Sequence, residues 1–150
     1  MNQPIKRHPS LQPISREHHF GLLLCWKIRQ GFRLNISPER IKKYSDWFWY
    51  NHLMAHFEIE EKYIFSVLPS DDALIVQAFA EHQRLKTLFE SEDIPLSLEL
   101  IEQELDQHIR FEERVLFNKV QQVATPEQLQ LIEENHNTPF EDNWEDEFWK

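Results

Sequence analysis

The sequence predicts an all-α protein, an antiparallel up-and-down four-helix bundle with a short additional C-terminal helix. Glycine occupies only 2 of 150 positions, which leaves little room for the tight turns of an all-β fold. Apolar residues make up 41% of the chain, and a chain of this length can bury a core without disulfides. Four long helical segments joined by short loops favour antiparallel neighbours.

Start and stop signals define the individual elements. Proline and small polar residues mark the boundaries of four long helices and one short one, at about residues 15–30, 37–68, 70–90, 95–123 and 125–134. Gly31 is expected to end the first helix in a left-handed conformation. Thr125 and Gln128 form a predicted capping box at the start of the last helix.

The prolines also set the predicted domain organisation. Pro4, Pro9 and Pro13 interrupt regular structure, so residues 1–13 are predicted to be an N-terminal arm. Residues 14–150 are then one domain, the bundle with its C-terminal extension.

Composition excludes several classes of function. The net charge of −10 disfavours binding to nucleic acid, which needs a basic surface, and docking on anionic lipid. No apolar run approaches the roughly 18 residues of a membrane span, and the N-terminus lacks the apolar segment of a signal peptide. The single cysteine, Cys25, cannot form an internal disulfide and suits a reducing compartment. We therefore expect a cytoplasmic protein with no nucleic-acid or membrane partner.

A repeated motif points to the chemistry. Residues 56–65 and residues 108–117 both read H-x-x-x-E-E-[K/R]-x-x-F. In each copy the histidine and the first glutamate are four residues apart, which places them on one helix face about one turn from each other.

That face is otherwise apolar in both helices. The two stripes at helical spacing are Trp49, Leu53, His56, Glu60, Ile64 and Val67, and Ile101, Leu105, His108, Glu112, Leu116 and Val120. A carboxylate within a core costs on the order of several kcal/mol unless a cation or hydrogen-bond donor meets it. Glu60 and Glu112 therefore predict a positive charge between their helices.

The remaining two helices each add a histidine. His82 lies on the apolar stripe of the third helix, between Phe79 and Lys86. In the first helix His18 lies on the better apolar stripe, whereas the stripe of His19 meets Arg29. We prefer His18, by a narrow margin over His19.

The predicted site thus has at least one donor from every long helix, four imidazoles and two carboxylates in all: His18, His56, Glu60, His82, His108 and Glu112. Such a mixture suits iron better than calcium or magnesium, which prefer oxygen ligands. Structural zinc usually takes four ligands, often thiolates. Six ligands with two carboxylates able to bridge predict two metal ions.

Residues 14–123, and the repeated H-x-x-x-E-E-x-x-x-F pattern above all, resemble the hemerythrin-like, or HHE cation-binding, family. The resemblance implies a four-helix bundle with two non-haem iron ions. Glu60 and Glu112 would bridge the irons, the four histidines would complete the coordination, and a ligand such as dioxygen would bind at an open position.

The chain departs from the family pattern at Lys86, where many members carry a second histidine of the third helix. One iron then lacks a ligand, or another residue takes its place. The nearest candidate is His52, one turn before His56, and others are His19, Glu61 and Glu113.

The resemblance leaves three functions open. The first is a di-iron protein that ligates dioxygen, nitric oxide or a related small ligand for sensing, storage or redox response. The others are a di-iron redox enzyme, for peroxide or nitric oxide reduction or iron–sulfur cluster repair, and an iron buffer. The acidic, aromatic tail at residues 136–150 is a possible surface for a protein partner. Glu133 and His136 have the spacing of half a ferritin-like ligand pair, but the second half is missing.

Overall fold

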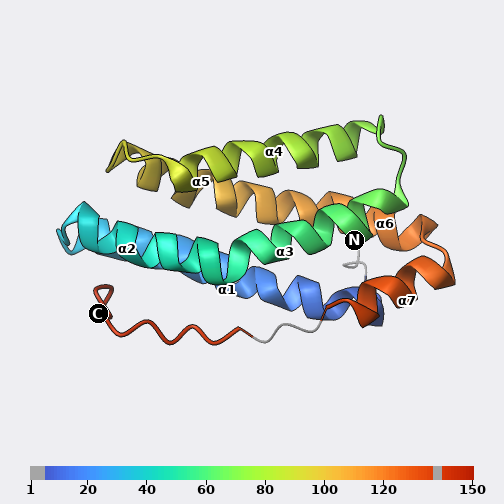
Figure 1. Cartoon of the computed structure of the whole chain (residues 1–150), viewed down its shortest axis with the longest axis horizontal. Helices are drawn as coiled ribbons and strands as arrows, with labels where there is room; N and C mark the ends of the chain where they lie inside the picture. Colours follow the sequence, from blue (N-terminus) through green and yellow to red (C-terminus); the bar gives the residue numbers. More distant parts are fainter. Residues whose placement is uncertain (1–5, 137–139) are drawn as a thin grey trace, which may run out of the picture.

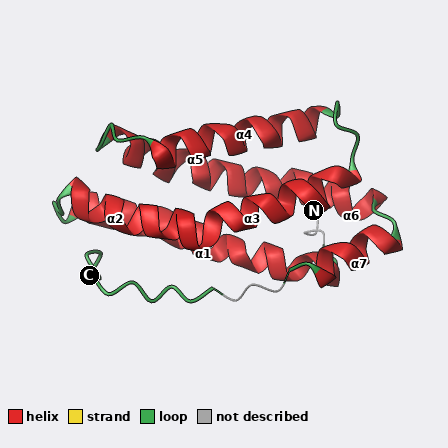
Figure 2. Cartoon of the chain, viewed as in Figure 1, coloured by secondary structure: helices red, strands yellow, loops and turns green. Residues whose placement is uncertain are grey.

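The computed structural model describes residues 6–136 and 140–150, and that part of the chain is helical with no strand (Figure 2). Its α-helices are α1 (Gln12–Arg33), α2 (Pro38–Phe48), α3 (Met54–Ile59), α4 (Ala73–Glu90), α5 (Leu96–Phe111), α6 (Phe117–Val123) and α7 (Pro126–Glu134). Helices α2 and α3 belong to one long rod, and α5 and α6 to another. These two rods, α1 and α4 form the four-helix bundle, and α7 is the short helix at one end (Figure 1). The predicted fold class is confirmed. No helix within the described residues is both long and apolar enough to cross a membrane.

The ends of α1 differ from the prediction. A 3₁₀ turn at Pro9–Leu11 leads directly into α1, so regular structure begins before residue 13. Pro9 and Pro13 each stand in the first turn of a helical segment, where a missing N–H is tolerated. Helix α1 also continues through Gly31, and the left-handed position beyond it belongs to Asn35, with φ 58°. Gly31 serves packing instead, because a Cβ there would lie 2.6 Å from Ile41 Cδ1.

Both copies of the repeated motif pass into a π-helical turn at their first glutamate. These turns are Glu60–Ile64 and Glu112–Leu116. A π turn holds more residues than an α turn and is common at functional sites. It shifts the faces that follow, so that two consecutive residues, such as Ile64 and Phe65, are both buried. For the same reason Leu68 is buried at the end of this rod, whereas the predicted Val67 is only half-buried.

The apolar core forms two clusters. One cluster includes Leu11, in the turn before α1, and Ile14 on α1, and the other includes Leu24 and Ile28 of α1. Between them, the side chain of His18 is 6% exposed. The buried polar layer of the bundle therefore lies between two apolar clusters that hold it from both ends.

Residues 140–150 run back along the bundle beside α1 and α2 (Figure 1). Asp142 accepts hydrogen bonds from Lys27 Nζ (2.9 Å) and from the Tyr44 hydroxyl (2.7 Å). Phe148 is 2% exposed, and Arg40 donates two hydrogen bonds to Asp146. The aromatic side chains of this segment thus complete the chain's own core, and its role in partner binding stays a prediction.

Candidate metal centre

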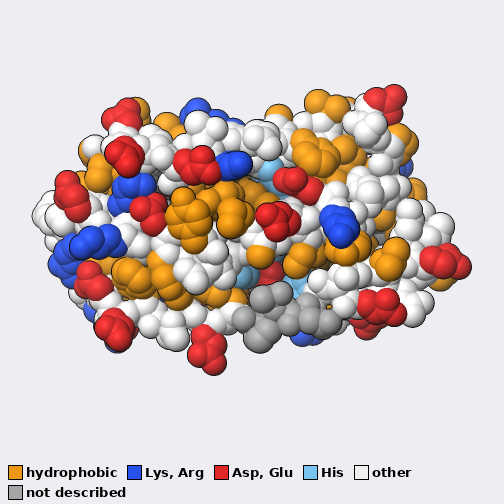
Figure 3. Space-filling view, in the orientation of Figure 1, with side chains coloured by type: hydrophobic (Ala, Val, Ile, Leu, Met, Phe, Trp, Pro, Cys, Tyr) orange, Lys and Arg blue, Asp and Glu red, His pale blue; other side chains and the backbone are white. Residues whose placement is uncertain are grey.

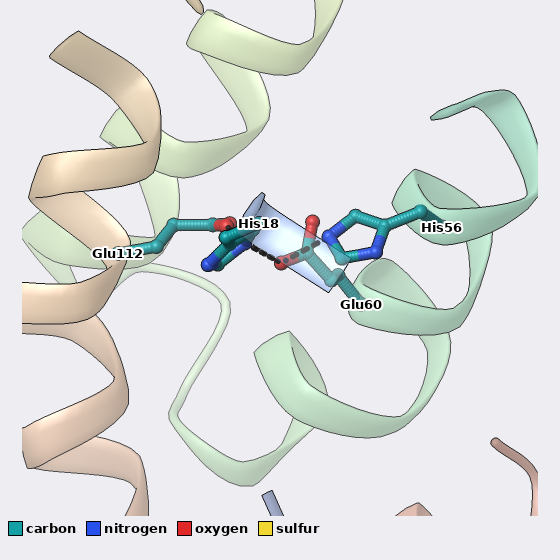
Figure 4. A group of neighbouring side chains, drawn as sticks. All are labelled: His18, His56, Glu60 and Glu112. Carbon is teal, nitrogen blue, oxygen red and sulfur yellow. Dashed lines mark ion pairs between the residues drawn. The ribbon is translucent and has the colours of Figure 1, made fainter. Parts of the chain in front are cut away.

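The six histidines and glutamates predicted from the sequence meet in the middle of the bundle. We call them the inner residues: His18, His56, Glu60, His82, His108 and Glu112. None has a side chain more than 6% exposed. They form two groups of four that share both glutamates, one with His18 and His56 and the other with His82 and His108. Figure 4 shows the first group, in which His56 and Glu60 of one rod point toward side chains from two other helical segments, His18 and Glu112.

The distances within the groups are those of atoms that can share an ion. Each histidine turns its Nε2 inward, and the nearest carboxylate oxygens lie at 2.9 Å (His18–Glu112), 3.3 Å (His56–Glu60), 3.3 Å (His82–Glu60) and 3.2 Å (His108–Glu112). Two ligand atoms about 2.1 Å from one ion lie about 3.0 Å apart at a right angle and about 3.4 Å apart in a tetrahedron. The donor atoms are therefore spaced for metal ions.

The hydrogen bonding of the inner residues leaves the same atoms unsatisfied. The Nε2 atoms of all four inner histidines, both oxygens of Glu60 and Oε2 of Glu112 are buried without a hydrogen-bond partner. Buried polar atoms are rarely left so. Cations would satisfy every one of these atoms at once, so the residues present fit a pair of metal ions.

A second set of glutamates orients the histidines. The Nδ1–H groups of His18, His56, His82 and His108 donate to Glu113 (2.7 Å), Glu17 (2.8 Å), Glu61 (2.7 Å) and Glu81 (2.7 Å) respectively. We call these four the outer carboxylates. Because a carboxylate only accepts, the hydrogen of each neutral ring lies on Nδ1, and the lone pair of Nε2 faces inward. This tautomer is the one that a metal site needs.

The outer carboxylates follow the repeat. Glu61 and Glu113 are the second glutamates of the two motifs. Glu113 accepts the hydrogen bond of His18 on α1, and Glu61 accepts that of His82 on α4. Glu17 and Glu81 directly precede His18 and His82, and each holds the histidine of the following rod. The sequence signals for these partners are the E-E and E-H pairs. Of the four, only Glu61 and Glu113 are candidates by sequence alone, and then as alternative ligands.

The electrostatics of the inner residues favour cations. Burial alone would lower the pKa of His56, but the charges of Glu60 and Glu17 outweigh it and raise the pKa to about 9. Burial opposes ionisation of Glu112 as well, yet the surrounding histidines, His108 first, hold its pKa well below the usual value. Without metal the site therefore attracts protons, and binding of metal ions releases them.

The remaining candidates lie outside the two groups. His19 is exposed, whereas His18 points inward, so the structure favours His18 for the first helix. Lys86 is exposed. A ligand at its position is not needed to give the two groups equal numbers of donors, since each group has two histidines and two glutamates. His52 is buried but belongs to neither central group, and burial, then the charge of His56, lowers its pKa to about 4. On the face drawn in Figure 3, histidine shows only as small patches among acidic and apolar side chains.

An outer carboxylate should matter without being a ligand. Glu81→Gln keeps the size of the side chain but removes the charge that faces the Nδ1–H of His108. We expect metal affinity to fall about 10- to 100-fold, the usual effect of losing such a partner, as measured by competition with a chelator. Glu104→Gln is the control, because Glu104 pairs with Arg84 at the surface. Equal affinities for Glu81→Gln and the control would contradict the orienting role.

The chain matches no protein-family model, no curated protein and no solved structure. Its fold and side chains therefore define its class. It is a helical bundle whose buried histidine and glutamate groups resemble a di-metal site and can bind metal ions.

Proposed function

We propose that this protein is a non-haem di-iron protein of the hemerythrin-like type, and that it binds a small ligand such as dioxygen or nitric oxide. The donor set supports iron, since imidazole and carboxylate together suit iron better than the all-oxygen sites of calcium and magnesium. The sharing of Glu60 and Glu112 between the two groups supports carboxylate bridges.

Within the protein, each residue type has a separate task. The inner histidines and glutamates would hold the two ions, and the outer carboxylates keep the imidazole rings in the required tautomer and orientation. The two apolar clusters keep bulk water from the polar layer. Bound iron would supply an open coordination position for the ligand.

A cavity beside the inner residues carries the small-ligand part of the proposal. It measures about 10 Å³, close to the least space that holds a single water molecule. One wall consists of inner residues and Glu17, and the other is apolar, with Gly21, Leu53, Phe57, Leu105 and Ile109. So small a space leaves no room for an organic substrate, which supports a small ligand over a larger one.

Gly21→Ala tests the cavity. A Cβ at Gly21 would lie 2.6 Å from Ile109 Cδ1 and 3.8 Å from Leu105 Cδ2, so the added methyl crowds the apolar wall. We expect the iron-loaded, reduced variant to bind nitric oxide about tenfold more weakly, equivalent to about 1.4 kcal/mol, with its iron content unchanged. Optical titration under anaerobic conditions measures the affinity.

Gly31→Ala is the matched control for this test. A Cβ there also meets a side chain at 2.6 Å, Ile41 Cδ1, but at the other end of α1. It should leave the affinity for nitric oxide as in the wild type. If Gly21→Ala retains both iron and full affinity, the ligand does not use this cavity.

A further inference from the structure

A second cavity lies beside the inner residue His82. It measures about 170 Å³ and is lined by residues of α4 and of the rod that contains α3: Trp49, Met54, Phe57, Glu58, Glu61, His82, Gln83 and Lys86. In the orientation of Figure 1, Figure 3 shows hydrophobic side chains at the surface between α4 and this rod, with acidic and basic side chains beside them. Unlike the small cavity at Gly21, this one has room for an organic molecule.

One wall of this cavity is aromatic and is fixed by stacking. Phe57 stacks on the ring of His82, with the centroids 3.7 Å apart and the planes at 9°. Trp49 stacks on Phe89 with the centroids 5.0 Å apart, and it meets Phe57 edge to face at 5.7 Å. Because Trp49 and Phe57 are both buried, the wall is already formed before any ligand arrives. A molecule that packs on Phe57 then lies one ring away from an inner histidine.

The polar groups that line the cavity have unused hydrogen-bonding capacity. Trp49 is 2% exposed, yet its Nε1–H is buried without a hydrogen-bond partner, whereas a buried indole N–H usually has one. Lys86 and Glu58 form no hydrogen bond or ion pair with any residue in the ranges 6–136 and 140–150. Glu61 uses Oε2 to accept the hydrogen bond of His82, which leaves Oε1. Donors and acceptors without partners are thus present around one cavity.

The size and charge of the cavity restrict the kind of ligand. A cavity of about 150 Å³ holds one benzene molecule, so about 170 Å³ suits a single ring. One lysine and two glutamates line the cavity, and this excess of negative charge disfavours an anion. A hydroxyl group suits the mixture, because it donates one hydrogen bond and accepts others.

We propose that this cavity binds a neutral single-ring phenol, with its ring against Phe57 and Trp49. The phenol hydroxyl accepts a hydrogen bond from the Trp49 indole or the Lys86 ammonium and donates one to a glutamate of the lining. The site gives a role to Lys86, which supplies no donor to the two groups of inner residues. The proposal goes beyond the proposed function and needs no small ligand at the metal centre.

Calorimetric titration of phenol into the full chain tests this site. We expect saturable binding of one phenol per chain with a Kd on the order of 1 mM, as suits so small a molecule. Benzoate has the same ring but a negative charge, and it should bind more weakly than phenol. No saturable binding of phenol would overturn the proposal, and benzoate binding more tightly than phenol would overturn the assignment of a neutral ligand.

Two substitutions locate the bound phenol. Trp49→Phe keeps a ring but removes the N–H, and Lys86→Met keeps the length of the side chain but removes the charge. Each should weaken phenol binding about three- to tenfold, the effect of losing one hydrogen bond. Trp26→Phe and Lys119→Met are the matched controls, because both residues are exposed and neither lines the cavity, and they should bind phenol as the wild type does. Wild-type affinity in both Trp49→Phe and Lys86→Met would place the phenol elsewhere and overturn the proposal.

Discussion

Glu60→Ala and Glu112→Ala are each expected to release most of the iron from both positions. Each glutamate belongs to both groups of inner residues, so its loss removes one donor, and one shared negative charge, from each. In a low-dielectric core the remaining donors no longer offset the repulsion between two cations. We expect affinity to fall by more than about 100-fold, beyond the range for loss of an outer partner. Iron per chain after iron-replete expression measures the effect.

Glu58→Ala is the matched control, because Glu58 is an exposed glutamate on the same rod as Glu60. It should retain all of its iron. Loss of only one ion from Glu60→Ala would mean that Glu60 belongs to a single group. Unchanged iron would mean that Glu60 is not a ligand.

Metal removal is expected to lower stability strongly. Without cations the inward Nε2 atoms and the oxygens of Glu60 have no hydrogen-bond partner, so metal binding is linked to folding. Each site contributes about 2.7 kcal/mol when free metal is at 100 times its Kd. At about 2–4 °C per kcal/mol for a chain of this size, two filled sites raise Tm by about 10–20 °C.

Thermal unfolding with and without Fe²⁺, under anaerobic conditions, measures this shift. Glu112→Ala serves as the comparison, since it should gain little from added metal. Equal Tm values for the metal-free and metal-loaded wild type would contradict the link between binding and folding.

The inner residues were predictable because helical spacing determines which side chains share a face. His56 and Glu60, and likewise His108 and Glu112, stand four apart on apolar stripes, and only a helix brings such residues together. The same periodicity gave only a narrow preference for His18 over His19, and the structure buries His18 and exposes His19. The capping box at Thr125 was equally local, and the structure confirms it.

Features that depend on contacts between helices do not follow from spacing within one helix. The pairing of Glu17 with His56 depends on how α1 is rotated against the second rod, which spacing within either helix does not determine. Gly31 looked like a helix end, but the packing of Ile41 decides its role. Lys27 and Asp142 are 115 residues apart, and only the folded tail brings them together.

The π-helical turns were missed for a different reason. Nothing in the composition of the residues after Glu60 and Glu112 distinguishes a π turn from an α turn. The predicted buried stripe therefore keeps α-helical spacing as far as Val67. The wider turn lets Glu60 face inward while its neighbour Glu61 accepts the hydrogen bond of His82. At each π-helical turn, the first glutamate of the E-E pair thus faces the metal centre and the second accepts a hydrogen bond from a histidine.

Iron content of the wild-type chain is the most direct test of the central claim. The protein is expressed with ample iron, purified without an affinity tag, and analysed for all first-row transition metals against protein concentration. Because the inner residues form two groups, we predict two iron ions per chain at the centre. One zinc ion per chain at the centre, or no metal at all, would contradict the di-iron assignment.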